Sequence, residues 1–453
     1  MADDGLAAAL VAQMLAAGAA KTRRAGVWGM TVRGQARRSA PALLLPMVRP
    51  LLDDPDQGVR SEVVWALRRS GVVSGQFADE TSGIASRYPQ TAGQVGFTPE
   101  YKAVESLMLL SDARWLDPVC AAVAGGHNMR SLRLLHHGMR WNPRVFDAVR
   151  RRLAQLGGTG GAHPAIPLLA AVLGQWVSRA AAAVPELLAV LPHAGEAVAR
   201  TLLRVGHCAP AMEPYLRALA KQTGDLEAAT AIWRLTGDPQ PLAGALHVLL
   251  ARDRSWPPLA ARIITEVGGV LLPLVPAAQA RLTGAPARTY PQRDVQVLAA
   301  RVVSAATGDP APAVPTVRAV LAARGTPASL AADLVADLAT THRKAAGDLA
   351  PVLRDLLDDP WSRVAAARAL WRLGTPPAEL VSPLTAAITA AYGGRGAVPL
   401  LVDMHAVEAV ADLEQLAERD ERIVISGSDD DLVWQDEILQ DELRTAVAAL
   451  CTA

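Results

Sequence analysis

The sequence contains the stretch LLDDPDQGVRSEVVWALRRSG at Leu51–Gly71 and a near copy, LLDDPWSRVAAARALWRLG, at Leu356–Gly374. In the first copy, Asp-Pro is typical of a helix start, because the carboxylate caps free N–H groups and Pro needs none there. Apolar residues then recur every three or four positions, which predicts one buried helix face, and Gly71 ends the helix. With the apolar PALLLPMVRPLL before it, the stretch predicts two helices joined by a tight acidic turn.

Shorter echoes of this pattern recur elsewhere in the chain. AIWRLTGDP (231–239) matches ALWRLGTPP (369–377), and TGDPQP returns as TGDPAP. Their separations are close to whole numbers of units of roughly 35 residues, the length of one helix pair. A capping residue precedes proline again at Thr98, Asn142, Thr326 and Ser382. Trp233 and Trp371 occupy the same place in their units, which favours packing between repeats over an exposed binding stripe.

The pattern resembles the HEAT repeat, and in particular the bacterial form known as PBS-lyase HEAT-like. Asp54-Pro55, Val59-Arg60 and Ala66-Leu67 carry the resemblance. It implies an all-α fold, an α-solenoid of about ten helical hairpins in which each unit is stabilised by its neighbours. In that family, Asp and Arg of successive turns form a ladder along the inner edge, so the resemblance implies a contact between Asp54 and Arg60.

The amino-acid composition is typical of a helical protein and suggests the compartment in which it lies. Of 453 residues, 51% are hydrophobic and only 4% aromatic, and arginine far outnumbers lysine, a bias typical of a GC-rich bacterial genome. Three cysteines without metal-ligand spacing fit a reducing compartment. The acidic start MADDG differs from a secretory signal, and the apolar run at 267–280 is broken by Gly and Pro. We therefore expect a soluble, cytoplasmic protein.

Breaks in the helical periodicity suggest how the chain is organised. The segment at 72–98 is rich in Gly, Ser and Thr and predicts a long inserted loop. GGTGGAH reads either as a flexible joint or as an extended helix-end turn. The predicted parts are basic N-terminal repeats (1–71), the inserted loop (72–98), repeats with an Arg-rich segment (99–156), the Gly-rich joint (157–163), central HEAT-like repeats (164–424) and an acidic C-terminal capping helix (425–453).

Charge is distributed unevenly although the net charge is only +1. Residues 1–158 hold 20 basic and 13 acidic side chains, whereas residues 403–453 hold 3 basic and 14 acidic ones. In a solenoid, distance along the sequence becomes distance in space, so we expect a basic end and an acidic end far apart. The final helix, from about Asp430 to Leu450, is expected to carry Asp436, Glu437 and Asp441 on solvated faces.

The most site-like stretch is HNMRSLRLLHHGMRW (127–141) with the arginines that follow it. Arginine forks bind phosphates or acidic peptides, although solvated helix faces would explain the same residues. His136 and His137 diverge by about 100° on a helix, and no carboxylate or cysteine completes a shell, so no metal or cofactor is expected. The candidate partner-binding residues are Arg130, Arg133, Arg140, Arg144, Arg150 and Trp141.

These features favour a non-enzymatic scaffold that binds a protein partner, possibly an acidic one, through its concave surface. One alternative is nucleic-acid binding, possibly for DNA repair, in which Trp141 or Trp115 would stack on bases. Another is a HEAT-type lyase or modifying enzyme with a carboxylate in the groove. No nucleotide-binding or catalytic motif is recognisable, so the expectation is that the protein is not an enzyme.

Overall fold

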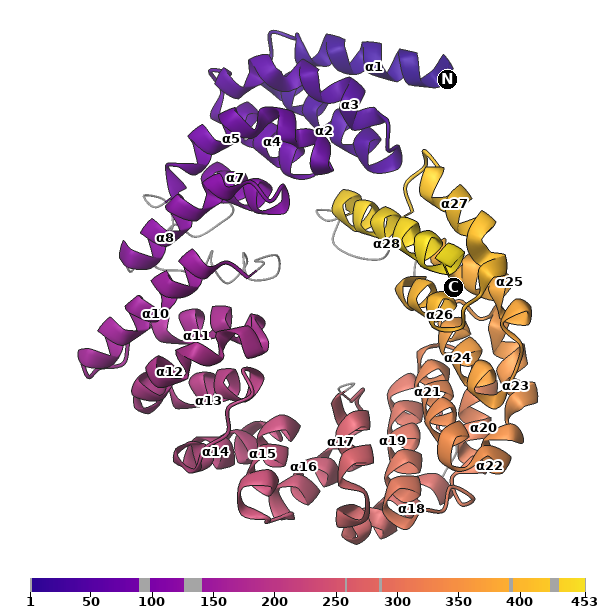
Figure 1. Ribbon diagram of the computed structural model, residues 1–453. Helices are drawn as coiled ribbons and strands as arrows, with labels where there is room; N and C mark the ends of the chain where they lie inside the picture. Colours follow the sequence, from indigo (N-terminus) through magenta and orange to yellow (C-terminus); the bar gives the residue numbers. More distant parts are fainter. Residues whose placement is uncertain are drawn as a thin grey trace. The chain divides into compact units, whose positions relative to one another are not determined.

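The computed structural model describes residues 2–88, 98–125, 141–256, 259–284, 287–390, 394–423 and 432–452, and Figure 1 shows a succession of short helices. Within these ranges there is no strand, and the one β contact is an isolated antiparallel bridge between Arg37 and Glu421. Consecutive helices pack against each other, as helical repeats require. The prediction of an all-α solenoid is confirmed.

The described chain divides into two compact units. The first contains residues up to Leu216, together with Asp420–Arg422 and the beginning of α28 (Leu432–Thr452) through Glu437. The second contains Arg217–Arg419, Ile423 and the rest of α28. Two segments from the C-terminal part of the sequence therefore complete the N-terminal unit, a feature that the repeat pattern does not predict.

The helices of the first unit are mostly short and rich in Ala and Leu, which lose least conformational freedom in a helix. Several are joined by 3₁₀ segments, labelled η. In chain order they are α1 (Ala2–Leu15), α2 (Ala20–Ala36), α3 (Ala40–Leu44), η1 (Leu45–Asp53), α4 (Gln57–Arg68), η2 (Gly71–Phe77), α5 (Ala78–Ala85), α7 (Pro99–Leu109), η3 (Ala113–Trp115), α8 (Leu116–Gly125), α10 (Pro143–Gly158), α11 (Ala165–Gln175), η4 (Val177–Ala183), α12 (Val184–Val190), η5 (Leu191–His193), α13 (Gly195–Arg204), η6 (Pro210–Met212) and α14 (Glu213–Thr223), whose last residues belong to the second unit.

The second unit is organised around the longest of its central helices, α19, beside which α21 and α24 lie in turn (Figure 1). Their small and aliphatic side chains form one continuous core. In chain order the elements are α15 (Leu226–Thr236), α16 (Gln240–Ala251), α17 (Leu259–Val267), η7 (Gly268–Leu274), α18 (Val275–Thr283), α19 (Tyr290–Thr307), α20 (Val314–Ala322), α21 (Thr326–Thr341), α22 (Arg343–Gly347), α23 (Ala350–Asp355), η8 (Leu356–Asp358), α24 (Arg363–Leu373), α25 (Pro377–Ile388), η9 (Gly394–Gly396), α26 (Ala397–Asp403), η10 (Val407–Ala409) and α27 (Val410–Glu418).

The two long copies in the sequence share a contact between an arginine and the backbone of the preceding turn. In the first copy, Arg60 at the start of α4 donates to the carbonyl oxygen of Asp54 at 2.5 Å. In the second, Arg363 at the start of α24 donates to the carbonyl oxygen of Leu357 at 2.6 Å, also six residues back. Each arginine thereby satisfies a carbonyl left open at the end of the preceding helix. When the two copies are aligned from their Leu-Leu pairs, both the arginine and its acceptor lie two positions earlier in the second copy.

The TGDP turns also repeat in detail. Gly237 and Gly308 end their helices in the left-handed region, with φ of +73° and +69°. Asp238 accepts a hydrogen bond from the backbone N–H two residues on at 3.0 Å, and Asp309 does the same at 2.9 Å. Glycine is favoured here because it adopts positive φ without a steric penalty. The short echoes therefore mark equivalent helix-pair boundaries.

The predicted helix starts are partly confirmed. Thr98 and Asn142 cap α7 and α10 through their side chains, as expected. The cap of α4 is Asp56 instead of Asp54, and Gly325 precedes α21 where Thr326 was the expected cap. Ser382-Pro383 lies inside α25, so that predicted start is wrong.

Two predicted breaks contain helix. Residues 71–85 form η2 and α5, so the prediction of a loop over 72–98 is wrong for its first half; residues 89–97 lie outside the described ranges. Phe77 and Ala85 are buried there. Packing of such apolar residues against neighbouring helices stabilises these short helical segments. At 157–163, α10 continues through Gly158 and Gly160 follows with φ of +70°, which is a helix-end turn.

Two further predictions concern apolar residues. Trp233 and Trp371 are partly buried against the core of the second unit, as predicted. The segment Leu259–Thr283 is, by length and composition alone, apolar enough to cross a membrane. Gly268, with φ of +50°, interrupts it between α17 and η7, and Ile264 and Leu271 lie in the core. The predicted break is therefore present.

The expectation of a solvated C-terminal helix is wrong at Asp436. This carboxylate is fully buried and accepts hydrogen bonds from Arg38 at 2.8 Å and from Arg422 at 2.9 Å. Glu437 accepts from the backbone N–H of Val72. Basic N-terminal and acidic C-terminal residues therefore neutralise each other within the first unit, and the prediction that the two charged ends lie far apart is also wrong.

Four non-glycine residues of the described chain have positive φ, and one of them, Val177, is β-branched. Val177, which follows α11, has φ of +46°, a region that β-branched residues avoid because Cβ crowds the backbone. Its side chain is 53% exposed, so removing it sacrifices little packing. We expect Val177→Gly to raise the free energy of unfolding by about 1 kcal/mol in urea denaturation. Val177→Ala, which keeps Cβ, should bring no such gain, and a less stable glycine variant would contradict the strain.

Candidate protein-interaction groove

The Arg-rich segment predicted as a binding site is only partly described. Arg130, Arg133 and Arg140 lie outside the described residues. Arg144 forms an ion pair with Asp117 of α8. Arg150 pairs with Glu186 of α12 at 2.7 Å. These last two arginines therefore already have carboxylate partners on neighbouring helices.

The tryptophans proposed for base stacking pack against other side chains, and Trp141 is partly and Trp115 almost completely buried. Trp141 lies with its ring centroid 4.8 Å from that of Phe146 and 5.3 Å from that of Trp176. Trp115 is buried, with 6% of its surface exposed. Aromatic pairs at these separations stabilise a core. Neither ring forms the open platform that stacking on a base requires.

Ion pairs between neighbouring helix pairs recur along the described chain at about the length of one repeat. The separations of the well-formed pairs range from 31 to 37 residues. The pairs are Arg23–Asp54 (2.7 Å), Arg68–Glu105 (3.1 Å), Arg150–Glu186 (2.7 Å), Arg301–Asp337 (2.6 Å) and Arg368–Asp333 (2.8 Å). The arginines in these pairs therefore link neighbouring repeats.

The family resemblance implied a ladder contact between Asp54 and Arg60. In the structure the partner of Asp54 is Arg23 instead. The Asp54 carboxylate accepts two hydrogen bonds from Arg23, at 2.7 and 2.8 Å. The Arg23 guanidinium holds the pKa of Asp54 below its ordinary value, against the opposing effect of burial. Arg60 instead donates hydrogen bonds to the backbone carbonyl oxygens of the turn.

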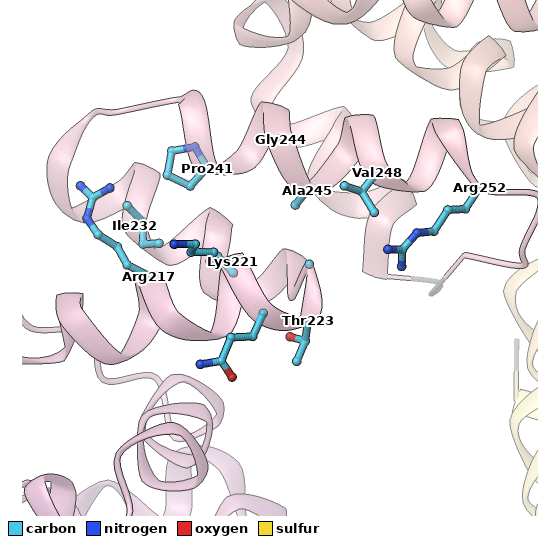
Figure 2. A pocket seen from close by; sticks show the side chains of 12 residues that line it. Arg217, Lys221, Thr223, Ile232, Pro241, Gly244, Ala245, Val248 and Arg252 are labelled. Atoms are coloured by element: carbon cyan, nitrogen blue, oxygen red, sulfur yellow. The ribbon is translucent and has the colours of Figure 1, made fainter.

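A groove with different chemistry lies between α14, α15 and α16, and all its lining residues belong to the second unit. Its volume is about 480 Å³. Figure 2 shows Ala245 and Val248 on α16 facing α14, with Arg252 extending into the space from the end of α16. The lining residues are Arg217, Ala220, Lys221, Gln222, Thr223, Gly224, Ile232, Pro241, Gly244, Ala245, Val248 and Arg252.

Local sequence explains why the groove is open. α14 ends at Thr223, and Gly224 turns the chain with φ of +66°. Asp225 then caps α15 by accepting from the backbone N–H of Ala228 at 3.0 Å. A Cβ on Gly224 would lie 3.9 Å from Val248, so the turn passes close beneath α16. Small residues at the crossing leave room beside the helices, because they fill less of the space between them.

The groove is positively charged at its rim. Arg217 has Asp238 at 3.7 Å, a long and half-exposed ion pair. The side chains of Lys221 and Arg252 are exposed and make no ion pair with any described residue. No acidic residue is among those that line the groove. Unlike the arginines between repeats, these two cations are available to an anionic ligand.

The sequence carried only a weak signal for this groove. Lys221 is one of four lysines, and it follows Arg217 by four residues, which places two like charges on one helix face. Such a pair destabilises an isolated helix slightly, so it suggests a requirement other than stability. Arg252 joins them only through the tertiary arrangement of α14 and α16, which no local pattern reveals.

The carboxylate of Asp294 in α19 is the clearest buried acid in the second unit. It is 4% exposed, and Ser255 donates to its Oδ2 at 2.6 Å, whereas Oδ1 has no hydrogen-bond partner. Burial raises the pKa of Asp294 above its ordinary value. It lines none of the grooves described, so its surroundings favour a structural role over a catalytic one.

This raised pKa predicts how stability depends on pH. Between the unfolded pKa and the higher folded pKa, the folded state binds more protons, so Asp294 makes the protein less stable as pH rises. The stability of Asp294→Asn relative to the original protein should therefore increase as the pH rises above about 4, the ordinary pKa of an aspartate. Thermal melts over this range test it, with the exposed Asp253→Asn as control. A constant difference between the two proteins would contradict the prediction.

Comparisons with known proteins bear on the fold alone. No protein-family model and no curated protein matches the chain. Yeast importin-β (Kap95p) is 12% identical with a TM-score of 0.46, and the match covers 97% of this chain and 57% of that one. UNC-45 from Drosophila melanogaster is 12% identical with a TM-score of 0.27, covering 99% and 63%. An engineered protein is 17% identical with a TM-score of 0.22, covering 98% of both.

These similarities are distant, and the chain spans less than two thirds of importin-β and of UNC-45. At such identities and TM-scores, what those proteins bind does not transfer to this chain. What they share with it is helical-repeat architecture. The packing of its own successive helices shows an all-α helical-repeat solenoid.

Proposed function

We propose that this chain is a non-enzymatic scaffold that binds an acidic segment of a protein partner in the groove between α14, α15 and α16. The observation that carries the proposal is the exposed, unpaired state of Lys221 and Arg252 beside an aliphatic floor. We also propose the cytoplasmic location and the PBS-lyase-like type of HEAT repeat that the sequence suggests.

The groove has two kinds of surface, and each suggests part of the ligand. Ile232, Ala245 and Val248 supply an aliphatic floor that would take a leucine- or valine-sized side chain. Lys221 and Arg252 would pair with carboxylates on either side of it, since charge-assisted hydrogen bonds are the strong ones. An acidic peptide with interspersed aliphatic residues satisfies both surfaces.

Nucleic-acid binding fits the same groove less well. None of its lining residues is aromatic, so it offers no stacking platform. A groove that follows a phosphate backbone needs many available cations. Arginines such as Arg150 and Arg301 are instead paired with carboxylates of neighbouring repeats. A lyase or modifying enzyme would need an acid or base in the site, and no carboxylate or histidine is among its lining residues.

Selection from a displayed library of random peptides tests this proposal. The full chain is the bait, and enriched peptides are measured by fluorescence anisotropy. We expect them to combine Asp or Glu with Leu, Ile or Val, and to bind less tightly as salt rises. Lys221→Glu with Arg252→Glu should weaken binding by roughly tenfold or more, about 1.4 kcal/mol.

A charge-matched control separates the groove from general electrostatics. Arg254→Glu with Arg262→Glu changes the same net charge at exposed residues of the second unit that do not line the groove. This control should bind almost as well as the original chain. The proposal is overturned if nothing is enriched, if enriched peptides lack acidic residues, if both double variants bind equally, or if a single-stranded oligonucleotide displaces the peptide.

A further inference from the structure

The first helix of the described chain, α1, exposes large apolar side chains to solvent. α1 and the connection after it contain no charged side chain from Gly5 to Ala20. Val11 and Leu15 are buried, yet Leu6 is 74% exposed and Leu10 57%. Apolar side chains of a helix normally face a packed neighbour, with polar residues on the solvent side.

A groove of about 330 Å³ lies beside this helix, within the first unit. Ala8 and Val11 of α1 form one wall, and Val32 of α2 and Leu43 of α3 contribute to the others. Val32 is 47% exposed and Leu43 57%, so the apolar surface is open to solvent. Solvent-exposed apolar side chains that gather around a concavity mark interaction sites more often than isolated ones do.

The surroundings of this groove are positively charged. Arg33 and Arg37 are among its lining residues, and no lining residue is acidic. Lys21 and Arg24 lie on the same helix, α2, and no acidic residue occurs between Gly5 and Leu52. The acidic neighbours of Arg37, Asp420 and Glu421, lie at 3.7 and 3.6 Å and are about half exposed. Pairs of that kind contribute little and exchange readily.

We propose that this groove binds an amphipathic helix of a protein partner whose apolar face is flanked by Asp and Glu. A groove walled by helices, with an apolar floor and a charged rim, is the geometry in which amphipathic helices are bound. Charge complementarity selects an acidic occupant. It also argues against a second copy docked by the same face, because symmetric pairing would bring the cations of both α2 helices together.

This site is independent of the groove at α14–α16. Its lining residues belong to the other unit, and its floor is formed by larger aliphatic side chains from three helices. The two grooves can therefore be tested separately. One variant pair for each site serves as the control for the other.

Selection from a yeast-displayed library of helical peptides, with the full chain as bait, tests the proposal. Enriched helices should carry aliphatic residues on one face and acidic residues beside it. Val32→Ser with Leu43→Ser should weaken their binding by roughly tenfold, whereas Val72→Ser, at an exposed position outside the groove, should not. Lys221→Glu with Arg252→Glu should also leave it unchanged. Since Val32 and Leu43 are exposed, circular dichroism should show both variants folded.

Three results would overturn the inference. The first is that no helix is enriched, and the second is that enriched helices are basic or uncharged. The third is concentration-dependent self-association of the chain in sedimentation velocity that Val32→Ser with Leu43→Ser abolishes, because a second copy would then be the occupant. A failure to detect peptide binding in the groove at α14–α16 would not contradict the proposal for this site.

Discussion

Replacement of Asp436 by alanine should destabilise the first unit by about 3–5 kcal/mol, because it removes the carboxylate that pairs with two buried guanidinium groups. Asp436 is fully buried, and the side chains of Arg422 and Arg38 are 3% and 10% exposed. Burial lowers the pKa of Arg422, and the Asp436 carboxylate opposes that effect. Removing the carboxylate therefore takes away a main compensation for burying the two cations.

Urea denaturation followed by circular dichroism gives the size of this effect, and hydrogen–deuterium exchange gives its place. Exchange should increase in α2 and at residues 420–422, where backbone hydrogen bonds join Arg38 to Asp420 and Arg422 to Ala36. The matched control is Asp441→Ala on the same helix, whose side chain is 82% exposed and forms an ion pair with the exposed Arg444. That control should change stability by less than about 0.5 kcal/mol. Equal effects of the two substitutions would contradict the buried network.

Replacement of Leu298 by alanine should destabilise the second unit by about 2–5 kcal/mol, because a buried leucine is lost and a cavity remains. Leu298 is fully buried in the middle of α19. That helix contacts α17, η7 and α18 on the N-terminal side of the sequence and α20 and α21 on the other. A cavity at this position therefore loosens the packing between successive helix pairs.

Leu272→Ala is a control with the same chemical change. Leu272 belongs to η7, which packs beside α19, but its own side chain is 55% exposed. We expect a loss below about 1 kcal/mol, since little area returns to water. Urea denaturation of both variants measures the contrast. If Leu298→Ala were no more harmful than Leu272→Ala, α19 would not be the shared core helix described above.

Local repetition made the architecture predictable. The two acidic turns and the two TGDP turns carry their geometry in a few adjacent residues, so Gly237 and Gly308 were recognisable as helix ends from sequence. Helix boundaries were less accurate, because a cap can move by one or two residues without changing the pattern, as it does from Asp54 to Asp56.

The sequence did not predict which charged side chains form ion pairs in the folded protein. Asp436 read as a solvated acid because nothing near it in sequence reveals that Arg38 lies 2.8 Å away. Arg150 read as available to a partner because Glu186, its ion-pair partner, lies one repeat further along the chain. Contacts between residues far apart in sequence decide whether a charge is free, and Lys221 and Arg252 emerge as binding candidates only after the paired arginines are identified.

The most direct test of acidic-peptide binding at α14–α16 is a hydrogen–deuterium exchange footprint of the full chain with a selected acidic peptide at saturation. Protection should appear at residues 217–224 and 241–252 and should be absent when Lys221→Glu and Arg252→Glu are combined. Protection confined to other helices, or no protection despite measurable binding, would contradict the assignment of this groove.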